Sequence, residues 1–253
     1  MEYQNPKIKK AQNSIIIIDD YIKDTVLLKE IEDDPNFFPA SMGENPRQLA
    51  SGNIYHNDNA SVFSPWMFWD GWWRSPCDTV KKRLVKAIWE DNLPCDLDEI
   101  VGFEYWTRTY NPGQYLPTHL DEDTFVYEKN GEFRCPMIGA VYYADFEVDE
   151  NVYPGVLEVH PGRVDVDIVQ QYLLSTTEED PHTMTHLKKY YKPTGKRDII
   201  TYRPNRLIIF DAGRILHGTT PTGENSQRFI VGINVWHKED PPSGYEKNLF
   251  FVE

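Results

Sequence analysis

The residues that decide the fold are 110–121, YNPGQYLPTHLD, together with a second stretch far downstream, 206–236, RLIIFDAGRILHGTTPTGENSQRFIVGINVW. His119 and Asp121 stand two apart, so in an extended strand both side chains point to the same side. His217, in the downstream stretch, can supply a third ligand. Two imidazoles and one carboxylate form a facial triad, which occupies three positions of an octahedral metal and leaves the others open. The pattern therefore predicts a metal site.

The same spacing of histidine and acid occurs at two other places, so context must choose among them. The triplet at His56 lies in GNIYHNDNAS, whose Asn, Asp and Ser residues indicate a surface loop. The triplet at His237 follows the last expected strand, and no later histidine completes a set. His119 follows an apolar and aromatic run broken by Asn-Pro-Gly, and a strand pair with the third ligand follows downstream. Context favours the His119 triad, which is typical of non-haem Fe(II) oxygenases.

Arg228 lies in the downstream stretch, and strand alternation predicts which way it points. The alternation places five residues on one face, which we expect to be the interior of a barrel: Arg228, Ile230, Gly232, Asn234 and Trp236. A guanidinium inside a barrel is costly unless it meets an anion, and a carboxylate fits its planar fork. We therefore expect Arg228 to bind a carboxylate.

Further motifs occur in order between 110 and 236. After YNPG and the HLD triplet come RCPMIGAVYYADF at 134–146, PGVLEVHP at 154–161, NRLIIFDAGRILHGTTP and QRFIVGINVW. In these motifs the chain resembles the 2-oxoglutarate- and Fe(II)-dependent oxygenases, and within them the prolyl hydroxylases of the collagen and hypoxia-sensing type. The resemblance implies a mostly β fold, with a double-stranded β-helix (jelly-roll) core and flanking N-terminal helices.

The resemblance also implies roles for individual residues: Fe(II) binding by His119, Asp121 and His217, cosubstrate binding by Arg228, Tyr142 and Tyr110, and substrate contacts by Trp236 and Arg134. Tyr142 would hydrogen-bond the distal carboxylate of 2-oxoglutarate, and Tyr110 would lie near its metal end. Either tyrosine can instead be a core residue with a satisfied hydroxyl. Trp236 can equally be packing, and Arg134 a surface charge.

The implied reaction is a hydroxylation of an unactivated C–H. It uses Fe(II), O2 and 2-oxoglutarate, with ascorbate in a supporting role, and 2-oxoglutarate is decarboxylated to succinate. Asp121 favours hydroxylation over halogenation, because related halogenases lack this carboxylate. The resemblance favours a peptidyl proline as substrate. The alternatives are a free amino acid or other small molecule, and a non-catalytic jelly-roll protein that binds a metal.

The rest of the chain is expected to belong to the same domain, 1–253, because the length and 40% hydrophobic content suffice for one core. A strand at 15–20, a helix at 21–31 and a helix capped by Asp78 would support a core at 101–238. The aromatic cluster at 66–73, WMFWDGWW, is expected in the core or a covering flap, with a substrate lid as the alternative. Residues 164–203 form an insertion, whose His182 and His186 are not expected to bind zinc.

Composition limits the class of partner. The net charge of −14 argues against nucleic acid, whose binding needs a basic face; the acidity favours solubility, with a basic substrate as the alternative. Cys77, Cys95 and Cys135 are odd in number and lack metal-binding spacing, which predicts reduced thiols. The apolar run at 15–18 is too short for a signal peptide or a membrane span, so we expect a cytoplasmic protein. The sequence does not indicate the oligomeric state.

Overall fold

The computed structural model describes residues 3–38, 62–63, 67–116, 118–123, 126, 132–144, 154–164 and 197–242. His56, the His182 and His186 pair and all but the two ends of the expected insertion at 164–203 lie outside these ranges.

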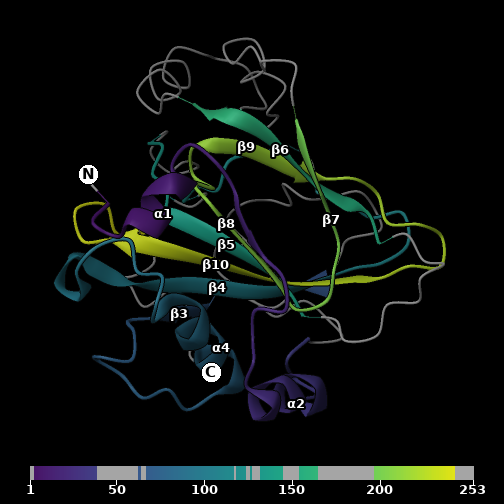
Figure 1. The fold of residues 1–253 in the computed structure, drawn as a ribbon, viewed down its shortest axis with the longest axis horizontal. Coiled ribbons are helices and arrows are strands. Elements are labelled where there is room, and N and C mark those ends of the chain that lie inside the picture. The colour runs from purple at the N-terminus through teal and green to yellow at the C-terminus, as the bar shows by residue number, and fades with distance from the viewer. Residues whose placement is uncertain are drawn as a thin grey trace.

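Two antiparallel sheets make up the fold. The larger has the strand order β1-β8-β5-β10-β4-β2, and β3 also pairs with β4; in that order the bounds are Ile16–Ile18, Arg206–Phe210, Ile138–Tyr143, Arg228–His237, Ile100–Tyr110 and Val62–Phe63, with β3 at Met67–Trp69. The smaller has the order β7-β6-β9, with bounds Asp198–Thr201, Val156–Arg163 and Ile215–Thr219. Figure 1 shows β6 and β9 lying over the larger sheet. This is the expected mostly β, double-stranded β-helix (jelly-roll) architecture.

The larger sheet separates two hydrophobic cores. Its outer face packs on the helical layer that contains α1 (Pro6–Ala11), α2 (Thr25–Asp33) and α4 (Val80–Trp89). Its inner face packs against the smaller sheet. Strand β8 shows the division, because Leu207 and Ile209 belong to the outer core whereas Ile208 and Phe210 belong to the inner one. Alternate residues of this strand therefore face the two cores.

The helices begin later than the sequence indicated. Helix α2 was expected from 21 but begins at Thr25, where Asp24 accepts hydrogen bonds from the amides of Val26 and Leu27. Helix α4 is capped by Thr79 rather than by Asp78, because the Thr79 hydroxyl accepts from the Lys82 amide. A 3-10 turn, η1 (Leu97–Glu99), leads into β4.

Most of the described part of the aromatic cluster, 67–73, belongs to the outer core. Phe103 of β4 is wholly buried and lies 5.7 Å from Trp72 in a stacked arrangement. Trp69 and Trp73 pack around the same ring, and Trp89 of α4 stacks on it from 6.5 Å. The core interpretation is confirmed for Met67, Trp69, Trp72 and Trp73. Phe68 pairs with Glu104 and therefore shares the cavity-facing side of β4.

Phe103→Ala is expected to destabilise the protein by about 3 to 5 kcal/mol, because the surrounding indoles cannot collapse into the space of a whole ring. Urea unfolding of the variant and the wild type measures this difference. Val26→Ala on α2 is the control, since Val26 is 65% exposed and its loss should change stability by less than about 0.5 kcal/mol. A Phe103 variant as stable as the wild type would show that the cluster is loosely packed.

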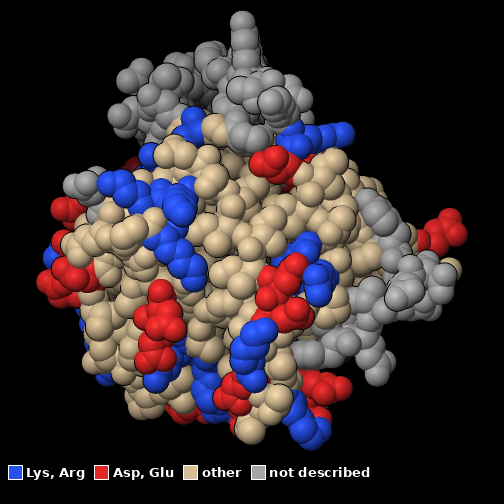
Figure 2. Space-filling view, in the orientation of Figure 1, with Lys and Arg blue, Asp and Glu red and all other residues tan. Residues whose placement is uncertain are grey.

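The surface carries acidic and basic side chains that are interspersed on the face shown in Figure 2. Several are paired: Arg203 and Arg206 both lie within ion-pair distance of Asp19. The three cysteines, all within the described ranges, are free thiols. Among the described helices, none has the length and apolar character that crossing a membrane requires.

Candidate metal centre and cavity

The candidate metal centre forms where the segment after β4 meets β9. The His119 amide donates to the His217 carbonyl at 2.8 Å, and the His217 amide donates back to the His119 carbonyl at 3.0 Å. This backbone pairing sets the two imidazoles beside each other, with ring centroids 4.3 Å apart. Two histidines far apart in sequence are thus held by the sheet itself.

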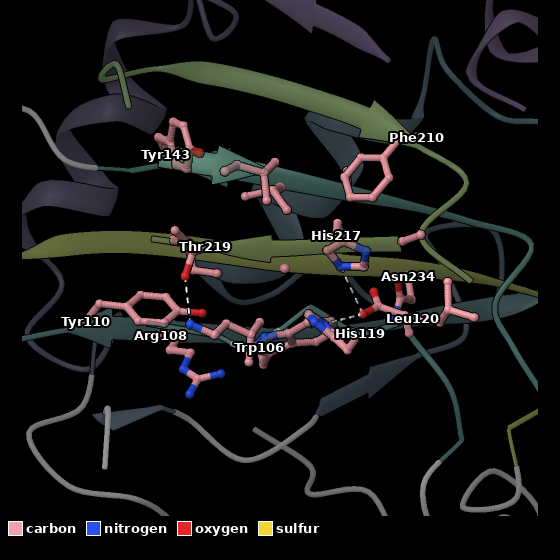
Figure 3. A pocket seen from close by; sticks show the side chains of 18 of the residues that line it. Trp106, Arg108, Tyr110, His119, Leu120, Tyr143, Phe210, His217, Thr219 and Asn234 are labelled. Carbon is pink, nitrogen blue, oxygen red and sulfur yellow. Dashed lines mark hydrogen bonds and ion pairs between the residues drawn. The ribbon is translucent and has the colours of Figure 1, made fainter. Parts of the chain in front are cut away.

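Asp121 completes the cluster. Its amide donates to the Ala212 carbonyl at 2.9 Å, which ties the segment to the turn before β9. Its Oδ1 lies 3.3 Å from His119 Nε2 and 3.5 Å from His217 Nε2 (Figure 3). The ligand atoms of the three residues all lie within 4.8 Å of one another. The structure therefore brings together the three residues that the sequence suggested.

The contacts around His217 orient its imidazole towards the cluster. Its Nδ1 lies 3.0 Å from the Ile215 carbonyl. Because a carbonyl only accepts, Nδ1 carries a proton, and Nε2 is the nitrogen that faces the cluster. Phe210 packs edge-on against the ring at 4.8 Å.

Asp121 is held in its charged form. Burial acts to raise its pKa, but the hydrogen bonds to His119 and His217 outweigh burial and hold the pKa well below its usual range. A charged carboxylate with two imidazole nitrogens is the donor set of a facial triad, and it fits Fe(II).

A cavity opens between the two sheets beside this cluster. Strand β10 lines it with every second residue, as strand alternation requires: Arg228, Ile230, Gly232 and Asn234. The expected inward face of 228–236 therefore borders the cavity over its first four members.

Arg228 lies at the end of the cavity away from the metal centre. It is 1% exposed, and its guanidinium stacks over the Tyr110 ring at 4.2 Å. One Nη donates to the Pro154 carbonyl and the other to Thr219 Oγ1, at 3.0 and 2.9 Å. Burial lowers the Arg228 pKa, and nearby Arg108 adds to this effect. Figure 3 shows Thr219, Tyr110 and Tyr143 together at this end.

Two buried polar atoms at this end are unmatched. Arg228 Nε and the Tyr110 hydroxyl have no hydrogen-bond partner among the residues that the structure describes. Both can donate, and a carboxylate is an acceptor that uses both. The end of the cavity therefore fits an anionic group such as the distal carboxylate of 2-oxoglutarate. The structure places Tyr110 at the Arg228 end of the cavity. The resemblance had implied a position near the metal end.

The role expected for Tyr142 is corrected by the structure. Tyr142 points to the outer core and donates its hydroxyl to Asn205 Oδ1 at 3.0 Å. The neighbouring Tyr143 faces the cavity, and burial raises its pKa to about 12. Register explains the exchange, since Tyr143 pairs with the inward residue Ile230.

Neither expected substrate residue lines the cavity. Trp236 is wholly buried and donates its indole N–H to Glu104 Oε2 at 3.1 Å, so it acts on the cavity through that carboxylate. Arg134 is bound by Glu132, by the Pro241 carbonyl and by Asp240. These contacts hold both side chains outside the lining of the cavity. Arg134 links the segment after β10 to the segment before β5.

A second group of ligand types, Cys95, Glu99 and His237, also lies within 4.8 Å, although the sequence gave His237 no third partner. Its chemistry is poorly suited to a metal. The Glu239 amide donates to His237 Nδ1, which leaves the proton on Nε2, the nitrogen that faces Glu99. Burial raises the pKa of the Cys95 thiol to about 12.

Several cavity residues were not identified from the sequence, notably Glu104, Thr219 and Tyr143. Thr219 lies two residues after His217 on the same strand, so strand alternation could have predicted that both side chains point to the same face. The position of Glu104 in the cavity depends on the pairing of β4 with β10, which the sequence alone does not reveal.

No family model and no curated protein sequence matches the chain. Among solved structures, the chain is similar to a prolyl 4-hydroxylase from Pseudomonas putida, with 14% identity, a TM-score of 0.50, and coverage of 90% of this chain and 95% of that one. It is also similar to a Trichoplax adhaerens prolyl hydroxylase in complex with a hypoxia inducible factor peptide, with 16% identity, a TM-score of 0.53, and coverage of 90% and 85%. The chain therefore has the fold of the prolyl hydroxylases among the 2-oxoglutarate- and Fe(II)-dependent oxygenases.

Proposed function

We propose that this chain is a 2-oxoglutarate- and Fe(II)-dependent dioxygenase that hydroxylates an unactivated C–H. The observation that carries the proposal is the convergence of His119, Asp121 and His217 within 4.8 Å at the edge of a cavity whose other end holds Arg228. Iron bound there supplies the oxidising chemistry, in which O2 and 2-oxoglutarate are consumed. The chain's part is to hold the ligands, bind the cosubstrate and exclude water.

The cavity supports binding of the cosubstrate in one direction. Arg228 Nε and the Tyr110 hydroxyl would receive the distal carboxylate, while Thr219 fixes the guanidinium. The keto-acid end would then reach towards the metal centre. Leu157 and Phe210 line the cavity and keep water from the space between the two ends.

A peptidyl proline is the first substrate class that we propose, because the fold is shared with prolyl hydroxylases, one of them solved with a peptide. A free amino acid or other small molecule is the second candidate, favoured by the polar Glu104 and Asn234 inside the cavity. A non-catalytic protein that binds a metal is the third. The free thiols fit the cytoplasmic location that we also propose.

An anaerobic titration with Fe(II) and 2-oxoglutarate tests the function. The expected result is a visible charge-transfer band from the chelate, followed by succinate formation when O2 is admitted. Ascorbate is added in one arm to test its supporting role. If folded protein never shows the band, the jelly-roll fold stands but the proposed enzymatic function is wrong.

Tyr143→Phe is expected to weaken 2-oxoglutarate binding by about tenfold, because the lost hydroxyl faces the anion-binding end and hydrogen bonds to charged groups contribute about 1.5 to 3 kcal/mol. The concentration dependence of the charge-transfer band measures it. Tyr142→Phe is the matched control, since its hydroxyl bonds Asn205 in the outer core. It should cost about 1 kcal/mol of stability and leave cosubstrate binding unchanged. If Tyr142→Phe weakened 2-oxoglutarate binding and Tyr143→Phe did not, Tyr142 would be the cosubstrate-binding tyrosine.

A further inference from the structure

Charge is divided along the cavity. On β4, Glu104 and Arg108 both face it, and four residues of extended strand separate their Cα atoms by about 13 Å. Arg108 stacks on the Tyr110 ring at 4.6 Å, on which Arg228 also stacks. Glu104 instead lies opposite Asn234 in the β4–β10 register. The cavity thus has a basic end at Tyr110 and an acidic end at Glu104.

Asn234 places an unmatched acceptor beside the metal ligands. It is 4% exposed, and its Oδ1 has no hydrogen-bond partner in the part of the chain that the structure describes. A Cβ built on Gly139 would lie 2.8 Å from Asn234 Oδ1 and 3.8 Å from Asp121 Oδ2, so both oxygens border the space that the glycine leaves open. Figure 3 shows Asn234 near His119. A buried acceptor is costly unless a ligand supplies an N–H or O–H.

Glu104 adds negative charge at the same end. It is 2% exposed, and the indole N–H of wholly buried Trp236 holds its Oε2 at 3.1 Å. Glu122 also lines the cavity. A carboxylate fixed in a low-dielectric cavity favours a cationic ligand over a neutral one of the same shape.

We propose that the acidic end binds a cationic nitrogen of the substrate, with Glu104 supplying the charge and Asn234 Oδ1 accepting an N–H. This inference rests on the proposed hydroxylase function and names its substrate class: an amine or guanidinium, carried by a free amino acid or by a basic side chain in a peptide. An internal peptidyl proline has no N–H on its ring nitrogen to donate to Asn234 Oδ1 and brings no positive charge to this end, so the acidic end favours a substrate other than the peptidyl proline proposed first. The bound cation lies beside the metal ligands, so C–H bonds near that nitrogen are the ones presented for oxidation.

Paired probes test the proposal by calorimetry on the protein loaded anaerobically with Fe(II) and 2-oxoglutarate. One arm compares L-proline with N-acetyl-L-proline, which removes the charge of a free amino group. The other compares end-blocked peptides that carry lysine or norleucine, and arginine or citrulline. In at least one arm, the cationic probe is expected to bind about tenfold or more tightly than its neutral partner.

Glu104→Gln is expected to remove that preference while leaving 2-oxoglutarate binding unchanged, because the amide oxygen can still accept from Trp236. Glu90→Gln is the matched control: it removes one negative charge on the surface, at the end of α4, and should keep the preference. Asn234→Ala should weaken the cationic probe as well.

Three outcomes would overturn the proposal: neutral probes that bind as tightly as cationic ones in both arms, no binding of any probe, or a preference that survives Glu104→Gln. If the Glu104→Gln variant does not fold, the comparison of cationic and neutral probes on the wild-type protein still tests the proposal. Failure of the hydroxylase function is seen separately, as a missing charge-transfer band before any probe is added.

Discussion

His217→Ala is expected to weaken Fe(II) binding by more than about 100-fold and to abolish turnover of 2-oxoglutarate. The substitution removes one of three protein ligands and leaves Asp121 with His119 alone, which is too few to hold Fe(II) with positions open for the cosubstrate and O2. The backbone pairing with His119 does not depend on the side chain, so the sheet should persist. The charge-transfer band under anaerobic conditions and succinate formation in air measure the two losses.

His237→Ala is the matched control, because it also removes a buried imidazole from the end of a strand but lies outside the metal centre. It should keep the band. Wild-type turnover in the His217 variant would refute the triad. Loss of iron on mutating His56, which lies outside the described residues, would instead show that the wrong histidine triplet was chosen.

Strand alternation was the strongest signal in the sequence, and it holds where strands pair without interruption. In β10, alternate side chains point to opposite faces of the sheet, and Arg228, Ile230, Gly232 and Asn234 share the face that lines the cavity. The double-stranded β-helix was implied by the resemblance of the ordered motifs between 110 and 236, and not by alternation alone. Most of the site therefore follows from local pattern.

Tyr142 shows where local pattern ends. Adjacent tyrosines at 142 and 143 face opposite sides of β5, and a slip of one residue exchanges their roles. Only the pairing of Tyr143 with Ile230 decides which hydroxyl reaches the cavity. The sequence contains no residue that fixes this register.

The same reason explains why Glu104 was missed and Trp236 was misplaced. Their contact joins β4 to β10, and it arises from strand neighbours that are distant in sequence. Trp236 contacts the cavity-lining Glu104 through its indole N–H but does not line the cavity itself. The cluster of Cys95, Glu99 and His237 likewise exists only because the start of β4 meets the end of β10.

Arg228→Ala is expected to weaken 2-oxoglutarate binding by about 2 to 5 kcal/mol, or about 30-fold and more, because a buried carboxylate would lose its charged partner. Fe(II) binding should be largely retained, since none of the three ligands is touched. Titration of the charge-transfer band with 2-oxoglutarate at saturating iron measures the affinity. The substitution also removes the hydrogen bonds to Pro154 and Thr219, so urea unfolding is measured alongside.

Two variants separate charge recognition from loss of packing. Arg228→Lys keeps the positive charge but loses the planar fork and the stacking on Tyr110, so it should recover only part of the affinity. Arg134→Ala removes a partly buried arginine whose partners all lie outside the cavity, and it should bind 2-oxoglutarate as the wild type does. If Arg228→Ala kept the wild-type dependence on 2-oxoglutarate, the basic end of the cavity would have to bind something else. The unmatched Arg228 Nε and Tyr110 hydroxyl would then indicate another anion at that end.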